Sequence, residues 1–246
     1  MFEGFSEKAL DFLNGIRLNN NKEWFEARKN IYTHELYEPM KALGDEIFQP
    51  FSNIDGMMCK VGRIYRDENF APYLHYRDTL WIYVRHDAMY WSKTPTLYFE
   101  ISPDGAEFGF RISAPSAAVM ERFRNDISND PEKLLNMVNE LESVHGMTIG
   151  GDEYKRKKKC IVPEAERFFA KKGLSAYITI KEKNELFSRC LSDRIIRTFK
   201  TVMPLYNYFC ELVNNVENEK KILKEENIGT ESAIDLVKAP DVDFMW

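Results

Sequence analysis

Apolar and polar residues alternate strictly along three runs between positions 79 and 112. The runs are Thr79 to His86, Thr96 to Ile101 and Ala106 to Ile112. Side chains of a strand point alternately to its two faces, so a period of two predicts strands with one buried face. The apolar positions that we expect on the buried face are Leu80, Ile82, Val84, Leu97, Phe99, Ile101, Phe108, Phe110 and Ile112.

A turn signal and two further runs extend this sheet. Pro103, Asp104 and Gly105 lie between the second and third runs, which predicts an antiparallel hairpin there. Val61 to Asp67 and Tyr177 to Lys181 are predicted as additional strands. The expected result is a central antiparallel sheet of about four to six strands.

Helical spacing flanks the strands on both sides. Ser6 is placed to cap a first helix, and two more helical segments follow it up to about Pro50. The helices predicted after the sheet begin at or span Pro115, Asp130, Pro163 to Lys172, and Asn184 to about Val216. This order of elements predicts an α+β fold, with the N-terminal helices on one face of the sheet and a long C-terminal helix.

The domain organisation is simple. The sequence has no internal repeat and no Gly/Ser linker, so residues 1–216 are predicted to form a single α+β domain. Residues 217–246 are predicted to be a polar C-terminal tail that docks back through its last residues, Phe244 to Trp246.

The second face of the predicted sheet combines aromatic rings with arginines and carboxylates. Its residues are Trp81, Tyr83, Arg85, Tyr98, Glu100, Glu107 and Arg111, joined by Arg63 and Tyr65 from the strand predicted at 61–67. Arginine holds carboxylate and phosphate groups through paired hydrogen bonds, so this face suits a ligand with an anionic and an apolar part. Ordinary cross-strand pairing of Arg with Glu and of ring with ring explains the same residues without a ligand.

Composition and charge limit the choice of partner. The formal net charge is -5 over 246 residues, so nucleic acid would need a local basic patch. The run KRKKK at 155–159 is such a patch, although charge runs are usually solvated loops. Four scattered cysteines, and the absence of any run near the ~18 apolar residues of a membrane helix, predict a reduced, cytoplasmic protein.

Residues with catalytic and binding chemistry gather between positions 63 and 75. Arg63 and Arg66 are candidates to hold a carboxylate or phosphate with help from Tyr73. Asp67 and His75 are the candidate acid or base. Alternatively, an Arg66–Asp67 or Arg63–Glu ion pair only pins the loop, because structural ion pairs resemble sites of this kind.

Motifs of the common chemistries are absent from the sequence. The four histidines lack metal-ligand spacing, no G-x-S-x-G marks a nucleophile, and neither the P-loop motif nor G-x-G-x-x-G occurs. We therefore predict no metal and no cofactor. Whether the protein is an enzyme stays open at this stage.

Two motifs carry a family resemblance. They are RIYRD at 63–67, followed by Phe70 and Pro72-Tyr73, and NNNKEWF at 19–25. In both, the chain resembles a bacterial family of unknown function, domain of unknown function 2461. The resemblance extends from about residue 2 to about residue 212, although the short, uncharged segment 69–72 departs from it and implies a weaker anion-binding role for that loop. The family has no assigned activity, so the resemblance implies the domain and no reaction.

Three functions are compatible with these observations. We favour binding of a small anionic ligand, phosphate- or carboxylate-bearing, by Arg63, Tyr65, Arg66, Tyr73, Trp81, Tyr83, Arg85 and Arg111. One alternative is an enzyme that acts on a phosphorylated or carboxylated small molecule. The other is a nucleic-acid-contacting module that uses rings of the sheet for stacking, against which the acidic net charge counts. The oligomeric state does not follow from the sequence.

Overall fold

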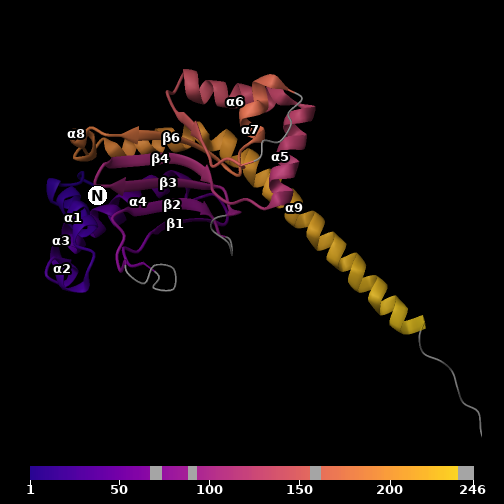
Figure 1. Ribbon diagram of the computed structural model, residues 1–246, viewed down its shortest axis with the longest axis horizontal. Coiled ribbons are helices and arrows are strands. Elements are labelled where there is room, and N and C mark those ends of the chain that lie inside the picture. Colours follow the sequence, from indigo (N-terminus) through magenta and orange to yellow (C-terminus); the bar gives the residue numbers. More distant parts are fainter. Residues whose placement is uncertain (67–73, 88–92, 156–161, 238–246) are drawn as a thin grey trace, which may run out of the picture.

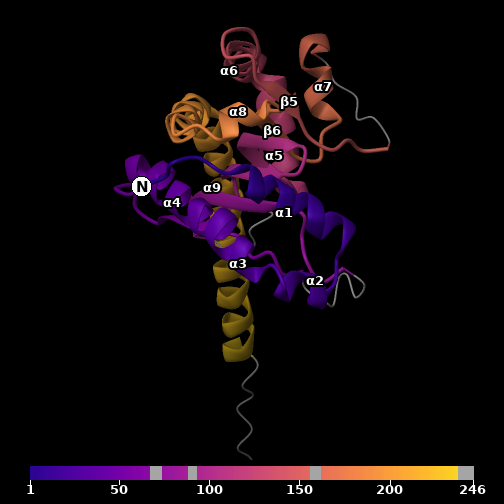
Figure 2. The same cartoon turned by 90° about the vertical axis from the view of Figure 1, so that its left-hand side faces the viewer.

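The protein is an α+β fold built on one sheet with helices packed against one of its faces (Figure 1). The structure, a computed structural model, describes residues 1–66, 74–87, 93–155 and 162–237, with side chains up to residue 222. Figure 2 shows helix α9 extending away from the sheet and the N-terminal helices. The predicted fold class is confirmed.

All six strands pair antiparallel, in the order β1-β2-β3-β4-β6-β5. The strands are β1 Met57–Val61, β2 Leu80–His86, β3 Thr96–Ser102, β4 Gly105–Ile112, β5 Thr148–Gly150 and β6 Leu174–Ile180. The predicted hairpin joins β3 to β4, and Gly105 takes a φ of 134°, which residues with a side chain rarely adopt.

Helices occupy the N-terminal quarter and most of the chain after the sheet. The first group is α1 Glu7–Leu18, α2 Lys22–Glu26, α3 Lys29–Ile31, the π-helical turn η1 Tyr32–Tyr37, α4 Glu38–Phe48 and the short helix η2 Gln49–Phe51. The second group is α5 Ala117–Asn129, α6 Pro131–Ser143, η4 Pro163–Ala165, α7 Glu166–Phe169, α8 Lys183–Leu186 and α9 Leu191–Val237. Ser6 and Asp130 cap α1 and α6 through their side-chain oxygens, as their positions predict.

The hydrophobic core lies between the sheet and helices α1, α4 and α9. Phe5 stacks on Phe99 of β3 with 5.9 Å between ring centroids, and Phe209 of α9 lies 5.6 Å from Phe110 of β4. The predicted buried face is confirmed, because Leu80, Ile82, Val84, Phe99 and Phe110 are all fully buried. Each such side chain stabilises the fold by roughly 1.5–3 kcal/mol when it leaves water.

The strand predicted at 61–67 is wrong in its position. Strand β1 ends at Val61, and the segment 62–66 pairs only irregularly with 75–81, as in the hydrogen bond from Gly62 N to Trp81 O (2.7 Å). The reason is at Gly62, where a Cβ atom would lie 2.3 Å from the Trp81 ring. The ring therefore fills the place where a side chain would continue the strand pattern.

Other differences concern element lengths. Strand β5 has three residues, too few for a periodic signal, and was not predicted. The helix predicted over 163–172 ends at Phe169, and the one predicted over 184–216 is divided into α8 and α9. Helix α9 continues through Val237 into the predicted tail, whose last residues lie outside the described part of the chain.

Candidate functional site

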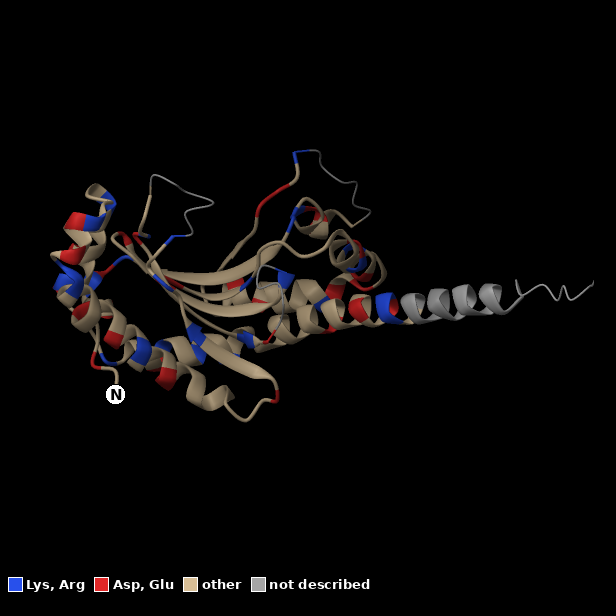
Figure 3. Cartoon of the chain, turned by 90° about the horizontal axis from the view of Figure 1, so that it is seen from below, with Lys and Arg blue, Asp and Glu red and all other residues tan. Residues whose placement is uncertain are grey.

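A cavity of about 550 Å³ lies on the polar face of the sheet, over strands β1 to β4. Figure 3 shows the helices of the described chain on the opposite face and at the two ends of the strands. We call this cavity the arginine cavity. It is lined by Lys60, Val61, Gly62, Arg63, Arg77, Thr79, Trp81, Tyr83, Arg85, Thr94, Thr96, Glu100, Arg111 and Ser113.

The strand register brings these side chains together. Tyr83 of β2 lies opposite Lys60 on one side and Tyr98 on the other. Trp81 lies opposite Glu100 in the same way. Directly paired residues share a face of the sheet, so the alternation that buries the apolar residues also forces the charged and aromatic ones into one layer.

Each of three arginines lies over an aromatic ring of this layer. The guanidinium carbon of Arg85 is 4.7 Å from the Tyr83 ring centroid, and that of Arg111 is 4.1 Å from the Tyr98 centroid. Arg77 lies over Trp81 at 4.7 Å. Stacking occupies the flat face of a guanidinium and leaves the N–H groups at its edge to bind other partners.

Arg85 is buried, and two of its three guanidinium nitrogens have no hydrogen-bond partner in the described chain. Its exposed fraction is 5%, and its Nε and Nη1 atoms have no partner among the described residues. Arg124 is the instructive contrast, because it is equally buried (7%) but donates to the carbonyl oxygens of Phe169 (3.2 Å) and Lys171 (3.4 Å). Buried polar groups in folded proteins are normally paired, and an unpaired charged group is costly.

The arginine cavity has a large excess of positive charge. Lys60, Arg63, Arg77, Arg85 and Arg111 line it, whereas Glu100 is its single acidic residue in the described chain. Glu100 is already paired, at 3.5 Å from Nη1 of Arg111.

The charged form of Arg77 is destabilised in this layer. Its Nε atom is also buried and without a partner in the described chain. Burial lowers the pKa of Arg77 below its usual value, and the nearby charge of Arg66 lowers it further against the opposing effect of Glu100. An anion bound beside Arg77 would relieve both penalties.

A second cavity of about 390 Å³ adjoins the first and shares Arg111 and Ser113 with it. In this cavity the Tyr98 hydroxyl donates a hydrogen bond to Glu107 Oε1. Burial, and next the hydrogen bond to Glu107, raise the pKa of Tyr98 well above its usual value. Tyr98 is therefore a neutral donor throughout the physiological pH range.

Some of the site residues predicted from the sequence line the arginine cavity, and others lie outside it. Arg63, Trp81, Tyr83, Arg85 and Arg111 line the arginine cavity.

The other described candidates lie outside that lining. Tyr65 packs edge-on against Phe25 with 5.6 Å between ring centroids, and His75 is exposed. Arg66 donates from Nε to the carbonyl oxygen of Tyr76 at 2.9 Å. Asp67, Tyr73 and most of the basic run lie outside the described residues.

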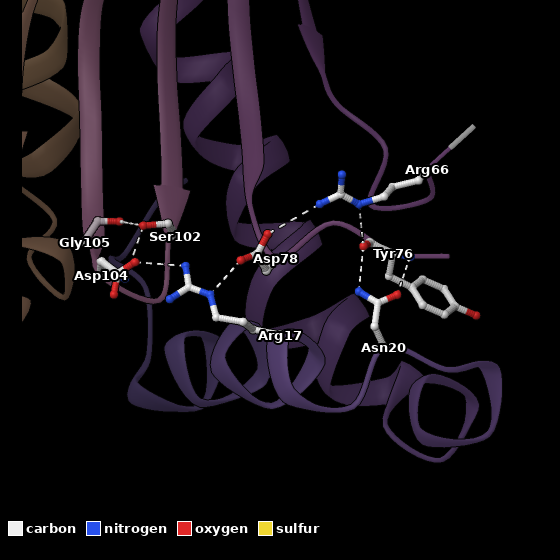
Figure 4. A network of polar contacts seen from close by, with 8 residues as sticks. All are labelled: Arg17, Asn20, Arg66, Tyr76, Asp78, Ser102, Asp104 and Gly105. Atoms are coloured by element: carbon white, nitrogen blue, oxygen red, sulfur yellow. Dashed lines mark hydrogen bonds and ion pairs between the residues drawn. The ribbon is translucent and has the colours of Figure 1, made fainter. Parts of the chain in front are cut away.

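Arg66 belongs to a polar network between helix α1 and the segment before β2 (Figure 4). Asp78 accepts from Arg17 at 2.6 Å and lies 3.7 Å from Arg66. The Asn20 side chain pairs with both backbone groups of Tyr76, at 2.8 and 2.9 Å. These contacts hold the segment that carries Arg77 and Thr79 at the edge of the arginine cavity.

Sequence reasoning missed several lining residues. The alternation places Thr79 and Thr96 on the polar face, but neither was among the predicted ligand-binding residues. Lys60 was missed because the strand was placed too late in the sequence. Arg77 lies two positions before Thr79 and fits the same alternation, but it precedes β2 in an irregular segment and was not among the predicted site residues.

The fold and the cavity together define an α+β protein with an arginine-rich surface over an antiparallel sheet. The chain belongs to the family described as conserved hypothetical protein (DUF2461), whose model matches residues 8–208. No curated protein matches the chain. Within the described residues, no three His, Cys, Asp or Glu side chains are grouped to hold a metal ion, and none of the helices is long and apolar enough to span a bilayer.

Proposed function

We propose that the protein binds a small anionic ligand, bearing phosphate or carboxylate groups, in the arginine cavity. The observation that carries this proposal is Arg85, a nine-tenths buried side chain that lines the cavity and whose Nε and Nη1 atoms have no hydrogen-bond partner among the described residues. The free cysteines Cys59, Cys190 and Cys210 fit the reducing, cytoplasmic compartment that we propose for it.

The energetics of Arg85 favour a ligand over a structural role. A buried donor without a partner costs about 1–3 kcal/mol, and more when it is charged. Arg124 shows that this fold pairs an equally buried guanidinium where the role is structural. Sites held against stability in this way are typical of binding and catalytic centres.

The proposal concerns binding and names no reaction. Of the two catalytic candidates from the sequence, His75 is exposed and does not line the arginine cavity, and Asp67 is outside the described residues. Nucleic acid is disfavoured because guanidiniums already cover a face of Trp81 and of Tyr83, the rings that a base would stack on.

The test is a thermal melting series with sodium phosphate. Phosphate should raise the melting temperature of the parent protein more than sodium chloride of equal ionic strength, because general screening acts equally in both. A concentration of about 100 times Kd adds about 2.7 kcal/mol of stability. Arg85→Met should abolish the phosphate-specific upshift.

The matched control is Arg122→Met, which removes an exposed arginine paired with Glu219 on α9. It should keep the upshift, since Arg122 does not line the cavity. The proposal fails if phosphate acts no better than chloride, or if the parent and Arg85→Met respond equally.

A further inference from the structure

We infer that the ligand of the arginine cavity carries at least two anionic groups held several ångströms apart. This inference rests on the proposed function and specifies the class of ligand. It follows from the charge balance of the cavity and from the separate positions of its guanidiniums.

The charge balance requires more than one negative charge. Of the described residues, five cationic side chains line the cavity, and Glu100, which Arg111 already pairs, is the one acidic side chain among them. A single carboxylate group carries one charge and neutralises little of this excess. Like charges in a partly buried space repel one another strongly, so a multiply charged anion is favoured far more than a singly charged one.

The rings over which the guanidiniums lie are also separated along and across the strands. Arg77, Arg85 and Arg111 each lie over a different ring, those of Trp81, Tyr83 and Tyr98 respectively. Trp81 and Tyr83 are two positions apart on β2, a rise of about 6.8 Å. Tyr83 and Tyr98 are direct cross-strand partners, with Cβ atoms about 4.5–5.5 Å apart.

One carboxylate group cannot form paired hydrogen bonds with three guanidiniums at once. Carboxylate and terminal phosphate groups often receive an arginine through two parallel hydrogen bonds, and a carboxylate has only two oxygens to accept them. Among the described residues, the arginine nitrogens without a hydrogen-bond partner belong to Arg77 and Arg85, which lie over different rings. Two anionic groups, one for each, complete the site.

The size of the cavity keeps the ligand small. A volume of about 550 Å³ is in the range of small-molecule pockets and not of a groove for a polymer. Linked phosphates, or a di- or tricarboxylate, fit this description. Both classes of ligand present the same chemistry, which is anionic oxygens joined by a short spacer.

The experiment is calorimetric titration of the full chain, without divalent metal, with phosphate, pyrophosphate, tripolyphosphate and citrate at constant ionic strength. Pyrophosphate or citrate should bind at least about tenfold tighter than phosphate. The tighter of the two shows whether the ligand is a polyphosphate or a polycarboxylate. Arg77→Met should reduce the affinity for the multiply charged ligand more than the affinity for phosphate. Arg85→Met should weaken both, and Arg122→Met neither.

The outcomes separate this inference from the proposed function. If phosphate, pyrophosphate and citrate bind equally well, the requirement for two anionic groups is refuted while anion binding stands. If Arg77→Met reduces the affinities for all ligands by one common factor, separate binding positions for two anionic groups are refuted as well. If no anion binds more tightly than chloride, both proposals fail.

Discussion

Replacement of Arg85 by Met should stabilise the ligand-free protein. Met is unbranched and similar in length to the aliphatic part of Arg, so it keeps the packing of the stem. The substitution removes a charge and two unpaired buried donors, Nε and Nη1. It also removes the stacking of the guanidinium on Tyr83, at 4.7 Å from the ring centroid.

The magnitude follows from these two effects. Relief of each unpaired donor is worth about 1–3 kcal/mol. Loss of a desolvated cation–ring contact costs about 2 kcal/mol. We expect a net increase of about 2 kcal/mol in the free energy of unfolding, which in a chain of this size raises the melting temperature by about 4–8 °C.

Urea denaturation in a buffer without phosphate or carboxylate measures this change. The matched variant is Arg124→Met, which leaves the carbonyl oxygens of Phe169 and Lys171 without their donor. It should lower the free energy of unfolding by about 2–4 kcal/mol. If Arg85→Met is destabilised to a similar extent, Arg85 is a structural residue and the reasoning is refuted.

Three further predictions address the surroundings of the cavity. Arg66→Met removes the hydrogen bond to the Tyr76 carbonyl and the contact with Asp78, so melting should show a loss of about 1–2 kcal/mol in the free energy of unfolding. The phosphate upshift should be retained, and its loss would contradict this prediction. Gly62→Ala should displace the Trp81 ring, 2.3 Å from the added Cβ, and weaken anion binding, seen as altered tryptophan fluorescence together with a higher Kd. Burial, and next Asp45, raise the pKa of Cys59 to about 12, above the unfolded value of about 8.5. The contribution of the Cys59 thiol to the free energy of unfolding is therefore complete below about pH 8.5 and declines above it. Between pH 8 and 10, urea unfolding should show a smaller loss of stability in Cys59→Ala than in the parent protein.

The sequence by itself determined the sheet and its two faces. Alternation along Thr79 to Ile112 placed three strands and the hairpin turn, because side chains of a strand must point alternately to opposite sides. The same alternation placed Trp81, Tyr83 and Arg85 together on the polar face. Helix caps at Ser6 and Asp130 were also local, since a cap needs only its own side chain and the next turn of backbone.

The tertiary structure alone decided which arginines were left without a partner. Arg66, expected beside the ligand, pairs with Asp78 in a network completed by Arg17, 61 positions away from Asp78. Arg85, which in the sequence is an ordinary member of an alternating strand, is buried with its Nε and Nη1 atoms unpaired in the part of the chain that the structure describes. Strand periodicity specifies the face on which a side chain lies and says nothing of contacts with distant segments. The pairing of a charge depends on those contacts, and so it emerged only when helix α1 was packed beside the segment before β2.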